Sequence, residues 1–209
     1  MKVISPINQI QQALYLKDFD PVAAQMKMAP RPRATVRTPE TPGQVRQGGV
    51  LILLYEVMGQ SHLVLTRRRD DLSSHAGQVS FPGGRREPGE TLQTTAFRET
   101  YEEIGVYPGE LDLLGYLATI YIPPTDYEVH PFVAWHRNGR PRFISQETEV
   151  AEILEVPLSL LLDPATRQEE LWEIRGFQLT VPFYLVEGHK VWGATAMILS
   201  EFLERLRQL

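Results

Sequence analysis

The segment from Gly83 to Val106, GGRREPGETLQTTAFRETYEEIGV, places the strongest constraint on how this chain can fold. It reads as a glycine turn, a short acidic loop and about three turns of helix. Gly105 follows the last residues of helical periodicity, where a glycine commonly ends a helix in the left-handed conformation. The segment therefore predicts a tight turn held next to a helix of defined length.

The acidic residues of this predicted helix border its buried face. Glu99, Glu102 and Glu103 share one sector, with Arg98 just beyond it. At about 100° per residue, the adjacent side of the helix carries Ala96, Phe97, Thr100, Tyr101 and Ile104. An ordinary surface helix would carry its acids opposite the apolar stripe. We therefore expect the three glutamates to line the edge of a cleft.

The spacing of the glutamates predicts a metal site. Glu99 and Glu103 are neighbours of like charge on the helix, at a cost of roughly a few tenths of a kcal/mol unless a cation lies between them. Oxygen ligands and the absence of cysteine favour Mg²⁺ or Mn²⁺ over zinc. Arg98 precedes Glu102 by one helical turn and could orient that carboxylate by a charge-assisted hydrogen bond. Taken alone, an E-x-x-E-E pattern would instead indicate a solvated helix face.

The whole segment resembles the Nudix box of the Nudix hydrolase family, G-x5-E-x7-R-E-U-x-E-E-x-G-U with U aliphatic. The matching positions are Gly84, Glu90, Arg98, Glu99, Glu102, Glu103 and Gly105. Thr100 replaces the usual aliphatic residue, in the middle of the buried sector and away from the acids. The resemblance implies an α/β fold, an α/β/α sandwich with a mixed central sheet. It also implies metal-dependent hydrolysis of a diphosphate linkage.

The residues before the box resemble the motif of the coenzyme A diphosphatase branch, L-L-T-x-R-[S/A]-x3-R-x3-G-x3-F-P-G-G. The matching residues are Leu65, Thr66, Arg68, Gly77, Phe81, Pro82, Gly83 and Gly84. Arg69 stands where Ser or Ala is usual, and Ser73 stands where a second arginine is usual. Because Ser73 has no guanidinium for a phosphate, Arg67 or Arg69 could bind that group in its place. The resemblance, which also includes residues 191–203, implies that coenzyme A or a derivative is cleaved to 3′,5′-ADP and 4′-phosphopantetheine.

The substrate-binding residues expected from this motif also suit phosphate chemistry. Gly83 and Gly84 allow close backbone approach, and a main-chain carbonyl at Gly83 could join Glu99, Glu102 and Glu103 as a metal ligand. The remaining expected contacts come from Arg68, with its planar fork, and from Arg67, His75 and Gln78. A lone loop histidine is more often structural than catalytic.

Hydrolysis also needs a carboxylate that accepts a proton from the attacking water. Within the box we expect Glu102 to do so, with Arg98, Glu99 and Glu103 completing the catalytic group. Glu128 and Glu147, in segments after the core strands, are alternatives.

Composition limits the classes of partner. The 209 residues suit one domain with or without extensions, and a net charge of −5 argues against a general nucleic-acid binder. With no cysteine and no apolar secretory core at the N-terminus, we expect a cytoplasmic protein. The uncharged run 113–125 is shorter than the roughly twenty residues of a membrane span and contains two prolines. The arginines at 67–69 and 85–86 could bind a small polyanion or simply aid solubility.

The chain pattern divides into a leader, residues 1–47, and a Nudix hydrolase domain, residues 48–209. Ser5 and Pro6 predict a helix start, with helices to about Leu16 and over 18–28, before a proline-rich strap over 29–47. The leader could pack on the domain or form a homodimer contact. Strands are expected at 50–56, 62–68, 79–81, 111–122, 127–136, 151–156, 171–176 and 177–186. A short helix is expected at 157–162, a turn or strand end at 189–192 and a terminal helix from Gly193.

Two other functions remain open at this point. The box specifies the diphosphate, so the substrate could be another nucleoside diphosphate derivative such as ADP-ribose, NADH or a damaged nucleotide. A Nudix-like module could also bind a nucleotide without cleaving it, although such modules often lack box acids that are present here.

Overall fold

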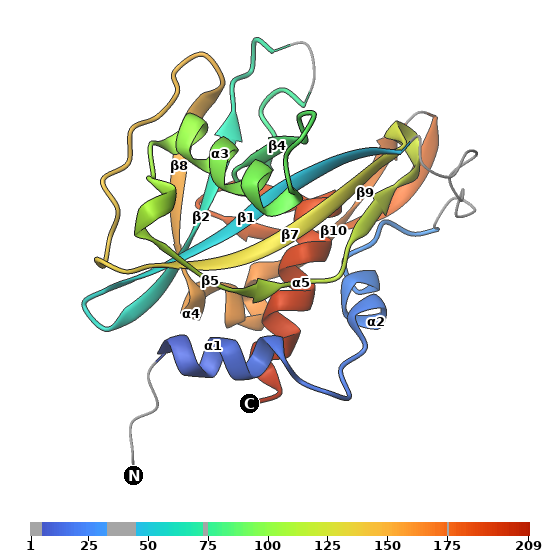
Figure 1. Ribbon diagram of the computed structural model, residues 1–209. Coiled ribbons are helices and arrows are strands. Elements are labelled where there is room, and N and C mark those ends of the chain that lie inside the picture. Colours follow the sequence, from blue (N-terminus) through green and yellow to red (C-terminus); the bar gives the residue numbers. More distant parts are fainter. Residues whose placement is uncertain (1–5, 33–44, 73–74, 175) are drawn as a thin grey trace.

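Strand β1 (Arg46–Val57) is the centre of the fold. In the computed structural model, which describes residues 6–32, 45–72, 75–174 and 176–209, its apolar run is buried on both faces. Leu51, Leu53 and Tyr55 pack into the core cluster that contains α3 residues, whereas Ile52 and Leu54 pack into the cluster that contains α5 residues. The two faces of β1 thus support two helical layers, and the predicted α/β/α sandwich is confirmed (Figure 1).

The remaining elements surround this strand. The α-helices are α1 (Pro6–Leu14), α2 (Pro21–Met26), α3 (Leu92–Ile104), α4 (Leu158–Leu162) and α5 (Gly193–Arg207). The strands after β1 are β2 (Gln60–Arg68), β3 (Val79–Ser80), β4 (Gly83–Arg85), β5 (Leu111–Tyr116), β6 (Ile120–Ile122), β7 (Tyr127–His136), β8 (Val150–Pro157), β9 (Arg167–Ile174), β10 (Phe177–Val186) and β11 (His189–Trp192). Short 3₁₀ turns are η1 (Pro108–Glu110), η2 (Pro123–Thr125) and η3 (Pro164–Thr166). In the described parts of the chain, no helix is long and apolar enough to cross a membrane.

The main sheet is mixed. Its order is β3-β2-β1-β7-β5, with β4 paired to β1, β6 to β7 and β8 to β2. The β1–β7 pair is parallel, and the other pairs are antiparallel. Because β4 and β7 both pair with the first residues of β1, the glycine turn lies at this end of β1.

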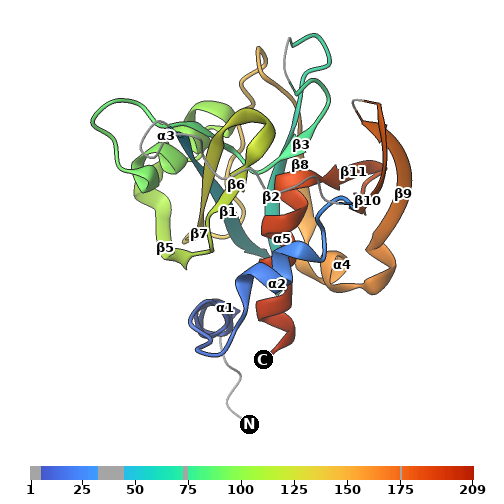
Figure 2. The ribbon, with the colours of Figure 1, turned by 90° about the vertical axis from the view of Figure 1, so that its right-hand side faces the viewer.

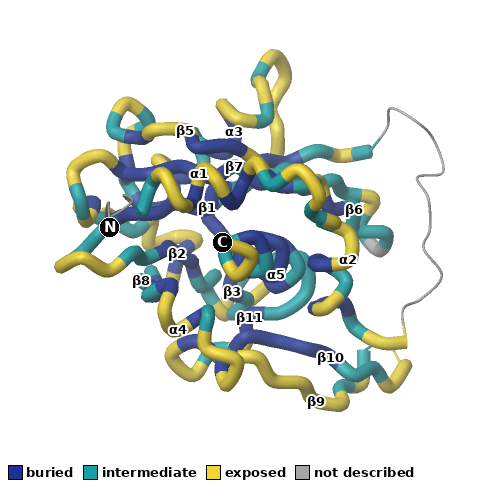
Figure 3. Tube along the Cα trace, turned by 90° about the horizontal axis from the view of Figure 1, so that it is seen from below, coloured by how far each residue is buried: buried dark blue, intermediate teal, exposed yellow. Residues whose placement is uncertain are grey.

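Strands β9, β10 and β11 form a separate antiparallel sheet, which the sequence pattern did not indicate. Both long strands were expected, but β9 starts at Arg167 and β11 adds a third strand. This sheet lies on the α5 side of the main sheet (Figure 2), and β9 is largely exposed (Figure 3).

The N-terminal helices pack against α5, so the described part of the leader lies on the domain. The fully buried Glu201 carboxylate accepts hydrogen bonds from Gln25 on α2 (2.8 Å) and from Arg205 (2.9 Å). Arg205 also donates to the carbonyl of Leu14 at the end of α1 (3.1 Å). These polar contacts fasten both helices to α5. The expected helix start at Ser5 and most of the expected strap lie outside the described residues.

The single long strand expected over 111–122 is wrong, because the chain leaves the ladder between β5 and β6. Pro131 on β7 lies opposite the break, and a proline has no N–H to continue the ladder. The amide of Ala118 instead donates to the buried carboxylate of Glu201. The other expected strands and the helices at 92–104, 158–162 and 193–207 are present, with ends shifted by a few residues.

Candidate active site

Helix α3 has the ends that its sequence predicts. The side chain of Thr91 accepts a hydrogen bond from the amide of Thr94 (3.1 Å) and caps the first turn. Gly105 adopts φ 74° and donates its N–H to the carbonyl of Tyr101 (2.9 Å), ending the helix. Between these caps Ala96, Thr100 and Ile104 are fully buried, whereas Tyr101 is half exposed. The helix is therefore fixed at both ends against the sheet.

Glycines allow this helix to lie against the backbone of β1 and β4. A Cβ atom at Gly49 would lie 2.3 Å from the carbonyl oxygen of Leu92. A Cβ atom at Gly84 would lie 2.4 Å from the carboxyl carbon of Glu99. Both distances are too short for real atoms, so the glycines are required for this packing. The carboxylate of Glu99 consequently lies directly against the glycine turn.

The Glu103 carboxyl is buried, with 7% of the residue exposed. Burial, and next the nearby Glu99, raise the pKa of Glu103 to about 8, while Arg68 and a backbone hydrogen bond with Gly83 act in the opposite direction. Its Oε2 atom has no hydrogen-bond partner in the described part of the chain. Burial also raises the pKa of Glu99, against the stabilising effect of Arg98. Both acids therefore occupy positions where their negative charges are not fully compensated.

Arg98 holds the outer acids of the box. Its guanidinium donates to Glu90 (2.7 Å), Glu99 (2.9 Å) and Glu102 (2.9 Å), and to the carbonyl of Arg85 (3.2 Å). The predicted Arg98–Glu102 hydrogen bond is confirmed, but Glu102 is largely exposed at the rim of the cluster. The Arg98 guanidinium holds the pKa of Glu90 well below its usual range, at about 2. The structure thus assigns Glu90 to the support of Arg98.

Glu149 joins the acidic cluster, although the sequence pattern did not reveal it. Its carboxylate lies 3.5 Å from the guanidinium of Arg68, and its charge contributes to the raised pKa of Glu99 and Glu103. The next residue, Val150, pairs with Arg68 across β2 and β8. This strand pairing is the signal that would have identified Glu149, and it cannot be read from local spacing.

The other acids considered from the sequence lie differently. The carboxylate of Glu128 accepts a hydrogen bond from Gln47 (3.1 Å). Glu147 is exposed and provides its backbone carbonyl to Arg69 (2.8 Å).

The expected substrate-binding residues fall into two groups. Arg68, Gly83 and Gly84 lie at the acidic cluster. Arg67 is instead bonded to Asp70 and Glu152. On the exposed loop before β3, the side chains of His75 and Gln78 are hydrogen-bonded to each other (2.8 Å). Ser73 lies outside the described residues.

The carboxylates suit a hard divalent cation. Glu103 has an orphaned oxygen, and the neighbouring Glu99 is pressed against glycine backbone, so a cation would relieve both the burial and the repulsion. In the described segments, no three acidic or imidazole side chains already stand in a metal-binding arrangement. The donor set therefore fits Mg²⁺ or Mn²⁺ chemically, with small side-chain movements required on binding.

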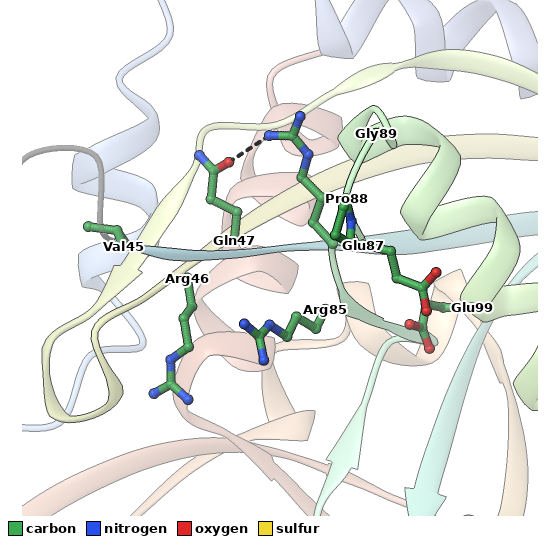
Figure 4. Close-up of a pocket in the computed structure, with 9 residues that line it drawn as sticks. Val45, Arg46, Gln47, Arg85, Glu87, Pro88, Gly89 and Glu99 are labelled. Atoms are coloured by element: carbon green, nitrogen blue, oxygen red, sulfur yellow. Dashed lines mark hydrogen bonds between the residues drawn. The ribbon is translucent and has the colours of Figure 1, made fainter.

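A cleft of about 790 Å³ adjoins this cluster (Figure 4). Glu99 forms part of its wall, so the cleft and the acids are continuous. The remaining lining is Val45, Arg46, Gln47, Arg85, Arg86, Glu87, Pro88 and Gly89. This volume lies in the range of small-molecule sites, and its position would let a ligand contact both regions.

Residues 45–174 match the model of the NUDIX domain family. Over 174 residues the chain is 32% identical to Nudix hydrolase 3 of Caenorhabditis elegans, covering 75% of this chain and 72% of the relative. Over 146 residues it is 38% identical to an uncharacterized Nudix hydrolase, NudL, of Photorhabdus laumondii, covering 69% and 77%.

Solved structures share the fold at low sequence identity. The Nudix hydrolase RenU of M. smegmatis has a TM-score of 0.52 at 17% identity, covering 78% of this chain and 83% of that one. The MutT protein of Methanosarcina mazei Go1 has a TM-score of 0.50 at 20% identity, covering 78% and 93%.

Proposed function

Because this chain belongs to the NUDIX domain family, we propose that it is a metal-dependent diphosphatase whose substrate is coenzyme A or a derivative. The observation that carries the proposal is the buried Glu103 carboxyl, which has an unpaired oxygen beside Glu99 and opens toward a cleft. Support for coenzyme A comes from the motif residues that precede the box, including Arg68 at the cluster.

In this proposal Glu99 and Glu103, with the main-chain carbonyl of Gly83, hold Mg²⁺ or Mn²⁺. The chemistry supplied by the bound cation is neutralisation of the diphosphate charge and acidification of a water molecule. Glu103 contributes to binding because its buried carboxylate gains a compensating charge. Gly84 keeps Glu99 in place, since a larger residue there would displace the carboxylate.

The remaining residues position the substrate and accept a proton. Arg68 offers a guanidinium fork to a phosphate, and its pairing with Glu149 keeps it near the acids. Arg98 is a positioning residue, because it orients Glu99 and Glu102 from behind. We propose an Oε atom of Glu102 or Glu149 as the acceptor of the water proton; Glu102 is held by Arg98 and Glu149 by Arg68.

The decisive experiment is incubation with coenzyme A and Mn²⁺ or Mg²⁺, followed by identification of the products. We expect 3′,5′-ADP and 4′-phosphopantetheine, and faster turnover than with ADP-ribose or NADH at equal concentration. Glu99→Gln and Glu103→Gln should each abolish hydrolysis while the fold is retained. Near-normal activity in both variants would refute the proposed metal site.

Other outcomes of this experiment point to the alternative functions. Faster hydrolysis of ADP-ribose or NADH would assign the diphosphatase to another nucleotide. Measurable nucleotide binding without turnover of any diphosphate would instead indicate a sensing module.

A further inference from the structure

Two arginines in the cleft have no acidic partner. Among the described residues, Arg85 makes no side-chain hydrogen bond or ion pair, and Arg46 donates to the carbonyl of Thr125. Most other arginines of the described chain are paired with carboxylates, as Arg207 is with Glu204 (2.7 Å). An arginine normally binds a carboxylate or a phosphate through its planar fork, so two unpaired forks in one cleft indicate a missing anion.

The strand pairing brings these arginines together. Arg85 on β4 pairs with Gly48 on β1, and Arg46 lies two residues before Gly48, on the same face of β1. Figure 4 shows the guanidinium groups of Arg46 and Arg85 pointing toward one another, with Glu87 and Glu99 directed away from Arg46. Arg46 also pairs with Tyr127 across β1 and β7. The two positive charges therefore share one end of the cleft.

Tyr127 connects this end with the acidic cluster. Its hydroxyl would meet a Cβ atom at Gly48, so it lies close over the backbone between the arginines. Burial and the Glu99 carboxylate raise the pKa of Tyr127, while Arg85 and Arg46 lower it. The phenol thus experiences both the acids and the arginines, which are within reach of one extended ligand.

Arg86 does not belong to this pair. It donates to Gln47 (3.0 Å) and to the carbonyl of Glu90 (2.7 Å), and its side chain lies on the opposite side of β1 in Figure 4. Its hydrogen bonds support the loop before α3.

We propose that Arg46 and Arg85 form a subsite for a phosphate monoester of the substrate, separate from the diphosphate that is cleaved. This inference rests on the proposed diphosphatase function and narrows its substrate class to nucleoside diphosphate derivatives with an additional phosphate. A monoester carries a charge of about −1.5 to −2 near neutral pH, which matches two guanidinium groups. The acidic cluster repels an anion unless a cation is present, so the extra phosphate is best placed at the arginine end.

The kinetic test compares coenzyme A with 3′-dephospho-coenzyme A, which lacks the monoester. The native protein should favour coenzyme A in kcat/KM by about 30-fold, the worth of one or two charge-assisted hydrogen bonds. Arg85→Gln and Arg46→Gln should each reduce this ratio by about tenfold, mainly through KM, and Arg85→Lys should restore part of it. The matched control is Arg207→Gln, because Arg207 lines another cleft but has a carboxylate partner. An unchanged ratio in Arg85→Gln and Arg46→Gln would overturn the subsite.

A binding test separates this inference from the catalytic proposal. Isothermal titration without metal should show 3′,5′-ADP binding more tightly than 5′-AMP in the native protein, and this preference should fall about tenfold in Arg85→Gln. If no diphosphate is hydrolysed but the preference depends on Arg85, the subsite stands and the diphosphatase proposal fails. If coenzyme A is hydrolysed and 3′,5′-ADP binds no better than 5′-AMP, the subsite is refuted alone. Thermal unfolding of each variant shows whether the fold is intact.

Discussion

Replacement of Glu103 by glutamine should stabilise the metal-free protein while it removes activity. The carboxyl is buried among negative groups, which raises its pKa from 4.5 to about 8. A difference of this size between the unfolded and folded states corresponds to about 4 to 5 kcal/mol at the upper end of the pH range. Glu103→Gln keeps the shape of the protonated acid and removes its ionisation, so this destabilisation should disappear.

The sign of the effect depends on which state ionises first. Between pH 4.5 and about 8 the unfolded chain loses the Glu103 proton and the folded protein keeps it. The free energy of unfolding therefore falls by about 1.4 kcal/mol per pH unit from this residue alone. Below pH 4.5 both states are protonated and the contribution vanishes. The advantage of Glu103→Gln over the native protein should accordingly grow from near zero at pH 4.5 to several kcal/mol at pH 8.

Urea unfolding in EDTA at three pH values between 5 and 8, on both proteins, measures this difference. Saturating Mn²⁺ should then reverse the order, because a cation that binds the folded state stabilises the native protein and not a variant without its ligand. Glu128→Gln is a suitable control, because Glu128 is bonded to Gln47 and its removal should give no such pH dependence. A difference between native protein and Glu103→Gln that stays constant with pH within about 1 kcal/mol would refute the reasoning.

Three further changes test other parts of the molecule. Gly84→Ala would place a methyl group 2.4 Å from the Glu99 carboxyl carbon, so coenzyme A hydrolysis should fall about 100-fold while the melting temperature changes little, because a flexible side chain can move. Glu149→Gln should lower kcat by at least about tenfold with little change in KM if it accepts the proton, and an unchanged kcat would exclude that role. Glu201→Ala leaves Arg205 buried without its acid and should cost about 3 to 5 kcal/mol in urea unfolding; a loss below about 1 kcal/mol would contradict the fastening role of Glu201.

Features set by local geometry could be predicted from the sequence. The ends of α3 follow from a capping threonine and a left-handed glycine, and helical periodicity places Glu99 and Glu103 on one sector. The apolar run of β1 predicts a buried strand, and the structure shows a covering layer on each of its faces. Periodicity was less reliable at the rim of α3, where Tyr101 was placed with the buried residues and is half exposed.

Features set by strand pairing could not be predicted in this way. The pairing of β2 with β8 changes register between Arg67 and Arg68, and this irregularity places Val150 opposite Arg68 and Glu149 beside it. A bulge adds one residue without a distinctive local pattern, so neither its position nor the acid that it delivers is visible in the sequence.

The two ends of the cleft differ in how far the sequence reveals them. The acids lie on one helix, and their contact is a consequence of residues per turn. Arg46 and Arg85 lie on different strands and meet because β4 folds back on β1 at Gly48. Two glycines, at 48 and 49, make this approach possible, because a side chain at either position would collide with the neighbouring strand or helix. A paired Gly-Gly at the start of a buried strand, two residues after an arginine, is thus the sequence feature that links the arginine end of the cleft to its acidic end.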